Sequence, residues 1–93
     1  MIIRVFRCRA KEGAADELQR LATEVSIPFV DAQQGLVARY TGRTGDELLM
    51  ISIWQDLHAL KGMTGEDWES EVIPDERISE LIEESSVQNY DSI

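Results

Sequence analysis

Residues 47–54 read Glu-Leu-Leu-Met-Ile-Ser-Ile-Trp, and this segment decides the fold class. Side chains alternate between the two faces of a strand. Both faces are apolar here, with Leu49, Ile51 and Ile53 on one and Leu48, Met50 and Trp54 on the other. A strand of this kind is typical of a sheet that is covered on both sides. The segment therefore predicts a central β-strand with neither face in water.

Three further strands are predicted around this one. Residues 36–41 precede it, and the turn formers of Thr41–Asp46 predict a hairpin loop that makes the two strands antiparallel neighbours. Ile2–Ala10 alternates as well, with Arg4, Phe6, Cys8 and Ala10 on one face and Ile3, Val5, Arg7 and Arg9 on the other. Residues 86–93 predict a polar, peripheral last strand.

Helical spacing separates these strands. Leu18, Leu21, Ala22 and Val25 form an apolar stripe, and Pro28 predicts a kink or an end of this helix near Ser26. Asp56 is a suitable N-cap for a short helix over residues 57–60 that is broken at Gly62. Trp68 and Val72 have helical spacing within residues 63–72. Pro74 fits the first turn of a last helix, whose apolar stripe is Ile78, Leu81 and Ile82.

The order strand, helix, strand, strand, helices, strand predicts an α+β fold, a ferredoxin-like split βαβ sheet with helices on one face. The 93 residues are enough for one domain, residues 1–93. A chain this short has no second layer for the other sheet face, so we expect a second copy to cover it as a homodimer.

Composition excludes several classes of function. The chain has 18 acidic and 9 basic residues, and a net charge of −9 disfavours binding to nucleic acid or to an anionic membrane. Apolar runs are too short for a membrane span. One cysteine, Cys8, cannot form an internal disulfide, and the start lacks the pattern of a secretory leader, so we expect a cytoplasmic protein.

The charge is uneven along the chain. Residues 66–84 carry nine acids and only Arg77, whereas the first eleven residues carry four bases and no acid. One interpretation is that the acidic helix faces are solvated and that some of them pair with the first strand. The other is that the basic side chains line a site for an anionic ligand.

Several local features resemble the antibiotic biosynthesis monooxygenase family of dimeric α/β barrels. They are Ile2–Ala10 with the following Lys11-Glu12-Gly13, the helix of residues 18–29 with Pro28, Gly35-Leu36 at the start of a strand, and Ile53-Trp54-Gln55-Asp56 before a small-residue helix. The resemblance covers nearly the whole chain. It implies a dimeric α/β barrel and a cofactor-independent monooxygenase, which oxidises a small phenol- or quinol-like aromatic with dioxygen in a pocket between sheet and helices.

The chemistry implied by this resemblance needs an apolar cavity, a base or hydrogen-bond donor for a phenolate, and exclusion of water. The candidate catalytic residues are His58, as a base, and Arg4, as the partner of an anionic oxygen. The candidate substrate-binding residues are Phe6, Trp54, Met63 and Trp68. No cofactor is expected.

Each of these residues also has a structural interpretation. Trp54 and Trp68 fit a core position or a helix anchor, His58 an exposed helical turn, and Arg4 an ion pair with the acidic helices. Cys8 fits a small buried hydrophobe. Tyr40 and Tyr90 can donate to a substrate or cap an edge. A non-catalytic small-molecule-binding or protein-interaction module of the same fold therefore remains the alternative function.

Two other chemistries are disfavoured. Haem-degrading members of the superfamily have an asparagine, a tryptophan and a histidine at three positions. This chain resembles them poorly there, because the corresponding residues are Phe6, Met63 and Ile73. None of these three side chains can replace its counterpart, so haem degradation is disfavoured. One histidine and one cysteine, with acids in a solvated run, do not make a metal-ligand cluster.

Overall fold

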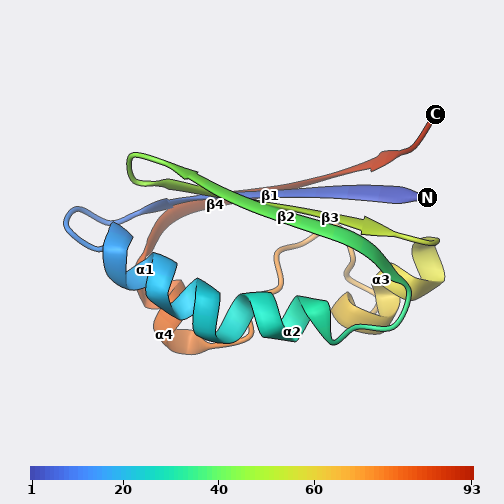
Figure 1. Cartoon of the computed structure of the whole chain (residues 1–93), viewed down its shortest axis with the longest axis horizontal. Coiled ribbons are helices and arrows are strands. Elements are labelled where there is room, and N and C mark those ends of the chain that lie inside the picture. Colours follow the sequence, from blue (N-terminus) through green and yellow to red (C-terminus); the bar gives the residue numbers. More distant parts are fainter.

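The computed structural model describes residues 1–93 as a four-stranded antiparallel sheet with every helix on one face (Figure 1). The strand order is β2-β3-β1-β4, so the segment of residues 47–54 lies inside the sheet as predicted. The predicted α+β fold is confirmed. The elements, in chain order, are β1 (Ile2–Ala10), α1 (Ala15–Leu21), the π-helical segment η1 (Ala22–Ser26), α2 (Ile27–Asp31), β2 (Leu36–Thr44), β3 (Glu47–Trp54), α3 (Leu57–Thr64), α4 (Glu76–Glu80) and β4 (Ile82–Asp91).

The predicted alternation of β1 is confirmed. Arg4, Cys8 and Ala10 are buried under the helices, whereas Arg7 and Arg9 are exposed. Antiparallel pairing places Cys8 opposite Leu48 on one side and Ser85 on the other. Because directly paired residues share a face, the register extends the two faces of β1 across the whole sheet.

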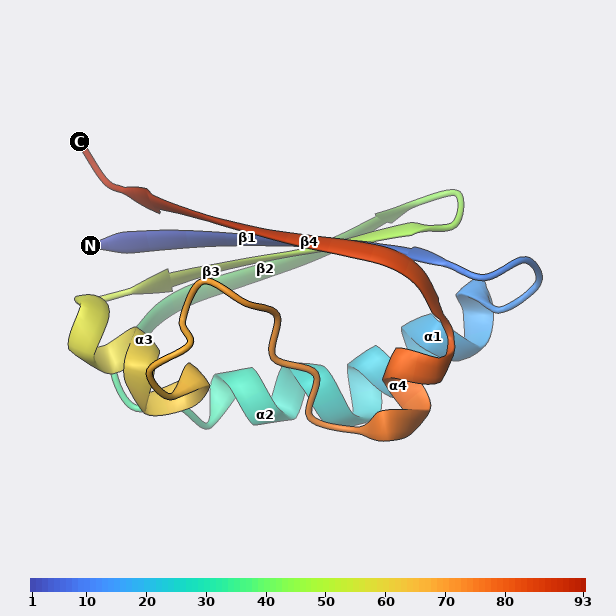
Figure 2. The same ribbon diagram turned by 180° about the vertical axis from the view of Figure 1, so that it is seen from behind.

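The first helical run continues through Pro28 and ends at Asp31, so the proline does not end it. Instead, the turn before it widens into η1, where the Ile27 N–H donates to the Ala22 carbonyl five residues earlier. Proline has no N–H to donate to the residue four earlier, and a widened turn accommodates this loss. The same helix therefore passes beneath the sheet from α1 to α2, where Val30 is buried (Figure 2).

Other predicted boundaries were wrong. β2 extends through Thr44 to a two-residue turn, so the predicted loop of residues 41–46 is mostly strand. Gly62 lies inside α3, because a glycine weakens a helix without having to end it.

Near the C-terminal end, α4 begins after an Asp75 N-cap rather than at Pro74, and Ile82 belongs to β4. No helix forms between residues 65 and 75. The helical spacing of Trp68 and Val72 therefore does not correspond to a helix in the structure.

Gly35 connects the helical layer to the sheet. Its φ of +85° is in the left-handed region, and a Cβ at this position would overlap the Cβ of Ala59 in α3. The glycine thus allows α3 to lie close to the start of β2.

The core between sheet and helices has two clusters. One contains Cys8, Ala10, Leu18, Leu21 and Ile78, and the other contains Val30, Trp54 and Leu60. Trp54 and Leu60 have no exposed surface. The candidate site borders the first cluster through Cys8, Leu18 and Ile78. None of the helices has the length and apolar character of a membrane-spanning segment.

The opposite sheet face has no covering element (Figures 1 and 2). Its central side chains are Ile3 and Val5 of β1 with Ile51 and Ile53 of β3, which are paired across the strands. Tyr40 and Tyr90 flank them and are 63% and 47% exposed. Within one copy of the chain, this face is an uncovered apolar surface.

Candidate functional site

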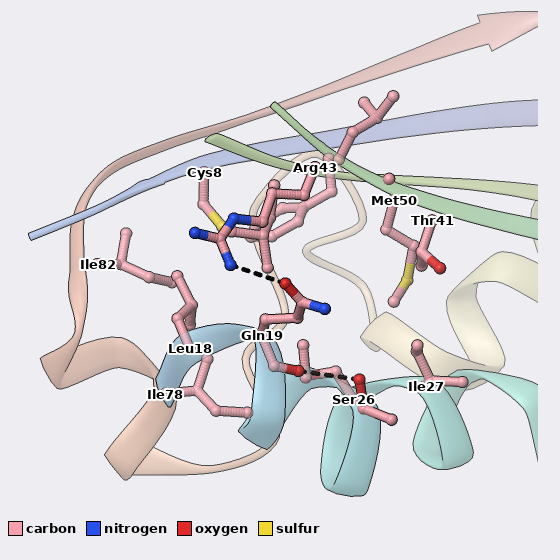
Figure 3. Close-up of a pocket in the computed structure, with 16 residues that line it drawn as sticks. Cys8, Leu18, Gln19, Ser26, Ile27, Thr41, Arg43, Met50, Ile78 and Ile82 are labelled. Carbon is pink, nitrogen blue, oxygen red and sulfur yellow. Dashed lines mark hydrogen bonds between the residues drawn. The ribbon is translucent and has the colours of Figure 1, made fainter. Parts of the chain in front are cut away.

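A cavity of about 200 Å³ lies between the sheet and the α1–η1 helix (Figure 3). Ten of its 16 lining residues are hydrophobic. The lining residues are Phe6, Cys8, Leu18, Gln19, Ala22, Thr23, Ser26, Ile27, Thr41, Gly42, Arg43, Leu48, Leu49, Met50, Ile78 and Ile82. An apolar cavity with a few polar groups is the usual form of a small-molecule site.

The secondary structure explains how this lining arises. Alternation in β1 directs Phe6 and Cys8 toward the helices, and the register sets Met50 and Leu48 of β3 beside them. The helix supplies Ala22 and Ser26, at the two ends of η1. π-helical segments occur frequently at functional sites because they shift side chains relative to a regular helix. The widened turn thus forms part of the cavity wall.

Arg43 is the charged residue of the lining. Its Nη1 donates to Asp16 Oδ1 and to Gln19 Oε1, each at 2.8 Å, and its Nε donates to the Gly45 carbonyl at 2.7 Å. Figure 3 shows the side chain reaching from the sheet toward Gln19 on α1. These contacts join the β2–β3 hairpin to the helix at one side of the cavity.

Neutral polar groups complete the lining. The Thr23 hydroxyl donates its hydrogen to the Gln19 carbonyl at 2.9 Å, so this hydrogen is not free for a ligand. Thr41 accepts from Arg39 at 3.3 Å, which leaves its own hydroxyl hydrogen free to donate. Ser26 is half-buried on the cavity side of η1. Its hydroxyl is available to a bound ligand.

Cys8 is 4% exposed on the sheet side of the cavity. Burial raises the pKa of its thiol, a hydrogen bond with the Leu48 backbone partly opposes this shift, and the nearby Glu47 carboxylate adds a smaller increase. The side chain is therefore a neutral thiol near pH 7 and not a nucleophilic thiolate. This agrees with its interpretation as a small buried hydrophobe.

A second, smaller cavity of about 60 Å³ lies farther toward α3. It shares Phe6, Ser26, Met50 and Ile78 with the first, and its other lining residues include Arg4 and Met63. The candidate residues Phe6, Arg4 and Met63 therefore come together at this second cavity. Of these three residues, Phe6 also lines the cavity of about 200 Å³.

Arg4 does not form the predicted ion pair with the acidic helices. Its guanidinium donates to the backbone carbonyls of Trp68 and Ser70, each at 2.7 Å, and to the Asn89 side chain at 3.4 Å. Burial lowers the pKa of this guanidinium, although the charge of Glu71 partly opposes the shift. Arg4 therefore attaches the irregular segment of residues 65–75 to the sheet.

The other arginines of β1 lie on the opposite face. Arg9 pairs with Glu84 of the neighbouring strand at 3.2 Å, and Arg7 is exposed. The basic residues of the first strand are thus divided between the two sheet faces, so they do not form one common lining for a ligand.

The remaining candidates lie outside both cavities. His58 is exposed on α3, and Trp54 is fully buried in the core, where its indole N–H donates to Ser52 at 3.0 Å. Trp68 is half-buried and packs against the second core cluster. Tyr40 and Tyr90 lie on the open sheet face. Nowhere do three His, Cys, Asp or Glu side chains gather in a way that suits a metal ion.

Sequence reasoning missed Arg43, Gln19 and Ser26. Arg43 was assigned to a hairpin loop, where a side chain has no defined face. Continuing the strand alternation from Arg39 through Thr41 predicts that Arg43 faces the helices, and its pairing with Leu48 confirms this direction. Helix periodicity alone does not predict the side-chain directions of Gln19 and Ser26, because η1 changes the turn between them.

No protein-family model matches the sequence, and a search of curated proteins finds no match. Solved structures do match. An antibiotic biosynthesis monooxygenase superposes with a TM-score of 0.78 at 16% identity, covering 100% of this chain and 99% of that one. A mutant of SnoaB, a cofactor-independent oxygenase from Streptomyces nogalater, gives 0.75 at 18% identity, with coverage of 98% and 91%.

The same fold also occurs outside proteins named as oxygenases. A NIPSNAP domain protein from Burkholderia xenovorans matches with a TM-score of 0.72 at 13% identity, covering 100% of this chain and 95% of that one. At such identities, the likeness establishes the fold and leaves the activity open. The predicted resemblance in fold to the antibiotic biosynthesis monooxygenases is confirmed.

Proposed function

We propose, from the fold shared with antibiotic biosynthesis monooxygenases and from the cavity beneath the sheet, that the chain binds a small phenol- or quinol-like aromatic and oxidises it with dioxygen without a bound cofactor. The observation that carries the proposal is the apolar cavity of about 200 Å³ beside η1. An engineered apolar cavity of about 150 Å³ is known to bind benzene. The space here therefore suits one substituted aromatic ring.

The cavity side chains can contribute binding, orientation and exclusion of water. Phe6 and Met50 supply apolar and polarisable contacts to a ring, and the hydroxyls of Ser26 and Thr41 can donate to a phenolic oxygen. A hydrogen bond to the phenolate favours the ionised form, which is the electron-rich form that dioxygen oxidises. His58, being exposed, has no part in the proposed site.

A quinol can supply every electron that the reaction needs. With hydroquinone, one oxygen atom of dioxygen enters the ring and the other leaves as water, so that hydroquinone and dioxygen give hydroxybenzoquinone and water. The substrate loses four electrons, two in the hydroxylation and two in the oxidation of quinol to quinone. No external reductant is required.

A filled cavity tests the proposal. Ala22→Phe places a ring into the cavity from η1, whereas Ala32→Phe adds the same ring at the exposed end of α2. We expect the wild type and Ala32→Phe to bind hydroquinones or anthrones in an NMR titration and to consume oxygen with them, and Ala22→Phe to do neither while remaining folded. Absence of binding by the wild type across the panel, or equal activity of Ala22→Phe, would overturn it.

A second candidate function is ligand binding without catalysis. It is favoured by the absence of a histidine or carboxylate among the 16 lining residues that could take a phenolic proton. In that case the same titration shows binding, while oxygen consumption stays at the rate of the ligand alone.

We also propose that the chain forms a homodimer through its open sheet face. The support is the row of apolar side chains from Ile3 to Ile53, which one copy leaves uncovered. A second copy presents the same surface and can cover it symmetrically.

A further inference from the structure

Arg43 is the only charged residue that lines the 200 Å³ cavity. Its side chain is 31% exposed, so most of its surface lies within the protein. A guanidinium beside an apolar cavity interacts more strongly with an anion than it would in water, because the local dielectric constant is lower. The charge is therefore well placed to select among ligands.

Arg43 also has N–H groups that donate no hydrogen bond within the protein. Its three hydrogen bonds come from Nε and Nη1, and none comes from Nη2. A carboxylate can accept two parallel N–H bonds from one guanidinium, a geometry that lysine cannot reproduce.

The present anionic partner of Arg43 can be displaced easily. The Asp16 side chain is 94% exposed, and an ion pair with a solvated carboxylate contributes little to stability. A ligand carboxylate held by the cavity can replace Asp16 on Nη1 while it also accepts from Nη2. Asp16 then returns to water without a large desolvation cost.

We infer that the ligand is an aromatic acid, whose ring fills the cavity and whose carboxylate binds to Arg43. This inference rests on the proposed function and narrows its substrate class. The cavity volume limits the ring system to about one ring, and a hydroquinone bearing a carboxylate combines the required quinol with the required anion. Ser26 and Thr41 remain available for the phenolic oxygens.

The test compares 2,5-dihydroxybenzoate with 2,5-dihydroxybenzamide, which has nearly the same shape without the charge. Both are titrated into the full chain under nitrogen and followed by amide NMR shifts. We expect the wild type to bind the acid about 10-fold or more tightly than the amide, the size of a charge-assisted hydrogen bond. Arg43→Gln should remove this preference, because it weakens binding of the acid by more than it weakens binding of the amide.

Asp16→Asn is the matched control, since it removes the competing carboxylate and keeps Arg43. It should bind the acid at least as tightly as the wild type does and leave amide binding unchanged. Equal affinity of the wild type for both ligands, or an equal loss of both in Arg43→Gln, would overturn the inference and leave the proposed cavity intact. Failure of both ligands to bind the wild type would overturn this inference as well, and the proposed function falls with it only if the unsubstituted hydroquinones and the anthrones of its own panel also fail to bind.

Discussion

Arg4 is a buried cation whose partners are backbone carbonyls rather than acids. Arg4→Met keeps much of the side-chain volume, leaves the Ser70 carbonyl without its donor, and leaves the Trp68 carbonyl with only the 3.3 Å hydrogen bond from the Asn89 amide. We expect the free energy of unfolding to fall by roughly 2–4 kcal/mol in urea denaturation. Arg9→Met is the control. It breaks an exposed pair with Glu84 and should lose about 0.5 kcal/mol or less.

The same variant distinguishes a local role from a general one. If Arg4 holds residues 65–75 to the sheet, hydrogen exchange in Arg4→Met should accelerate most at the amides of this segment. Uniform acceleration across β1 and β3 would contradict the anchoring role, because it would indicate a loss of global stability alone.

The buried thiol of Cys8 should make the stability of the protein depend on pH in the alkaline range. Its folded-state pKa is raised, so the unfolded chain loses the thiol proton first, near pH 8.5. The contribution to stability is fully present below that pH and is lost as the pH rises toward the folded pKa. The free energy of unfolding of the wild type should therefore decrease more steeply between about pH 8 and pH 9.5 than that of Cys8→Ala. If the free energy of unfolding falls with pH equally steeply in the wild type and in Cys8→Ala, the predicted contribution of Cys8 is refuted.

At the scale of elements, Gly35 controls the approach of α3 to the sheet. Gly35→Ala meets an unfavourable φ and an overlap with Ala59, and should lose roughly 2–4 kcal/mol. Gly13→Ala has a similar φ of +78° but open space around the new Cβ, so it should lose only about 1–2 kcal/mol.

A double mutant separates these two effects. Ala59→Gly removes the overlapping methyl group, so Gly35→Ala should cost less in this background than in the wild type. Thermal and urea unfolding of the four proteins give the coupling energy. A coupling of zero would show that the overlap is relieved by a shift of α3.

The elements themselves were predictable to different degrees. The two faces of β1, the continuous apolar run of β3 and the helical stripe from Leu18 to Val25 are local patterns, so the sequence shows them directly. Residues whose structure depends on distant contacts were not predicted correctly. Ile82 fits a helical stripe equally well, and its pairing with Ala10 places it in β4.

The candidate site shows the same limit. Phe6 could be placed beside a cavity because strand alternation fixes its direction. Strand alternation places Arg4 on the correct face. Its partners Trp68 and Ser70 lie in an irregular segment, and because such a segment has no periodic sequence pattern, its path could not be predicted. His58 lies in the predicted helix, but the exposed face on which it falls depends on the packing of α3 against Trp54 and Val30.

At the scale of the whole molecule, one sheet has one covered and one uncovered face. Four strands spaced about 4.8 Å apart, with about eight residues each, give a face of roughly 500 Å². Two copies together would bury about 1,000 Å², which is near the lower limit for a stable interface. The face has apolar residues at its centre and the pair Arg9–Glu84 at one end, as an interface core with a polar rim does.

Ile51 tests this interface because it lies in a central row of the face, paired with Val5 on one side and Tyr40 on the other. A lysine at this position can reach water in a monomer but would bury two charges close to the symmetry axis of a dimer. Sedimentation should therefore show a dimer for the wild type at micromolar concentration and a folded monomer for Ile51→Lys. Glu12→Gln, which changes the net charge by the same amount in an exposed turn, should remain dimeric. A monomeric wild type, or a dimer that Ile51→Lys leaves unchanged, would show that the exposed apolar row is not the contact between copies.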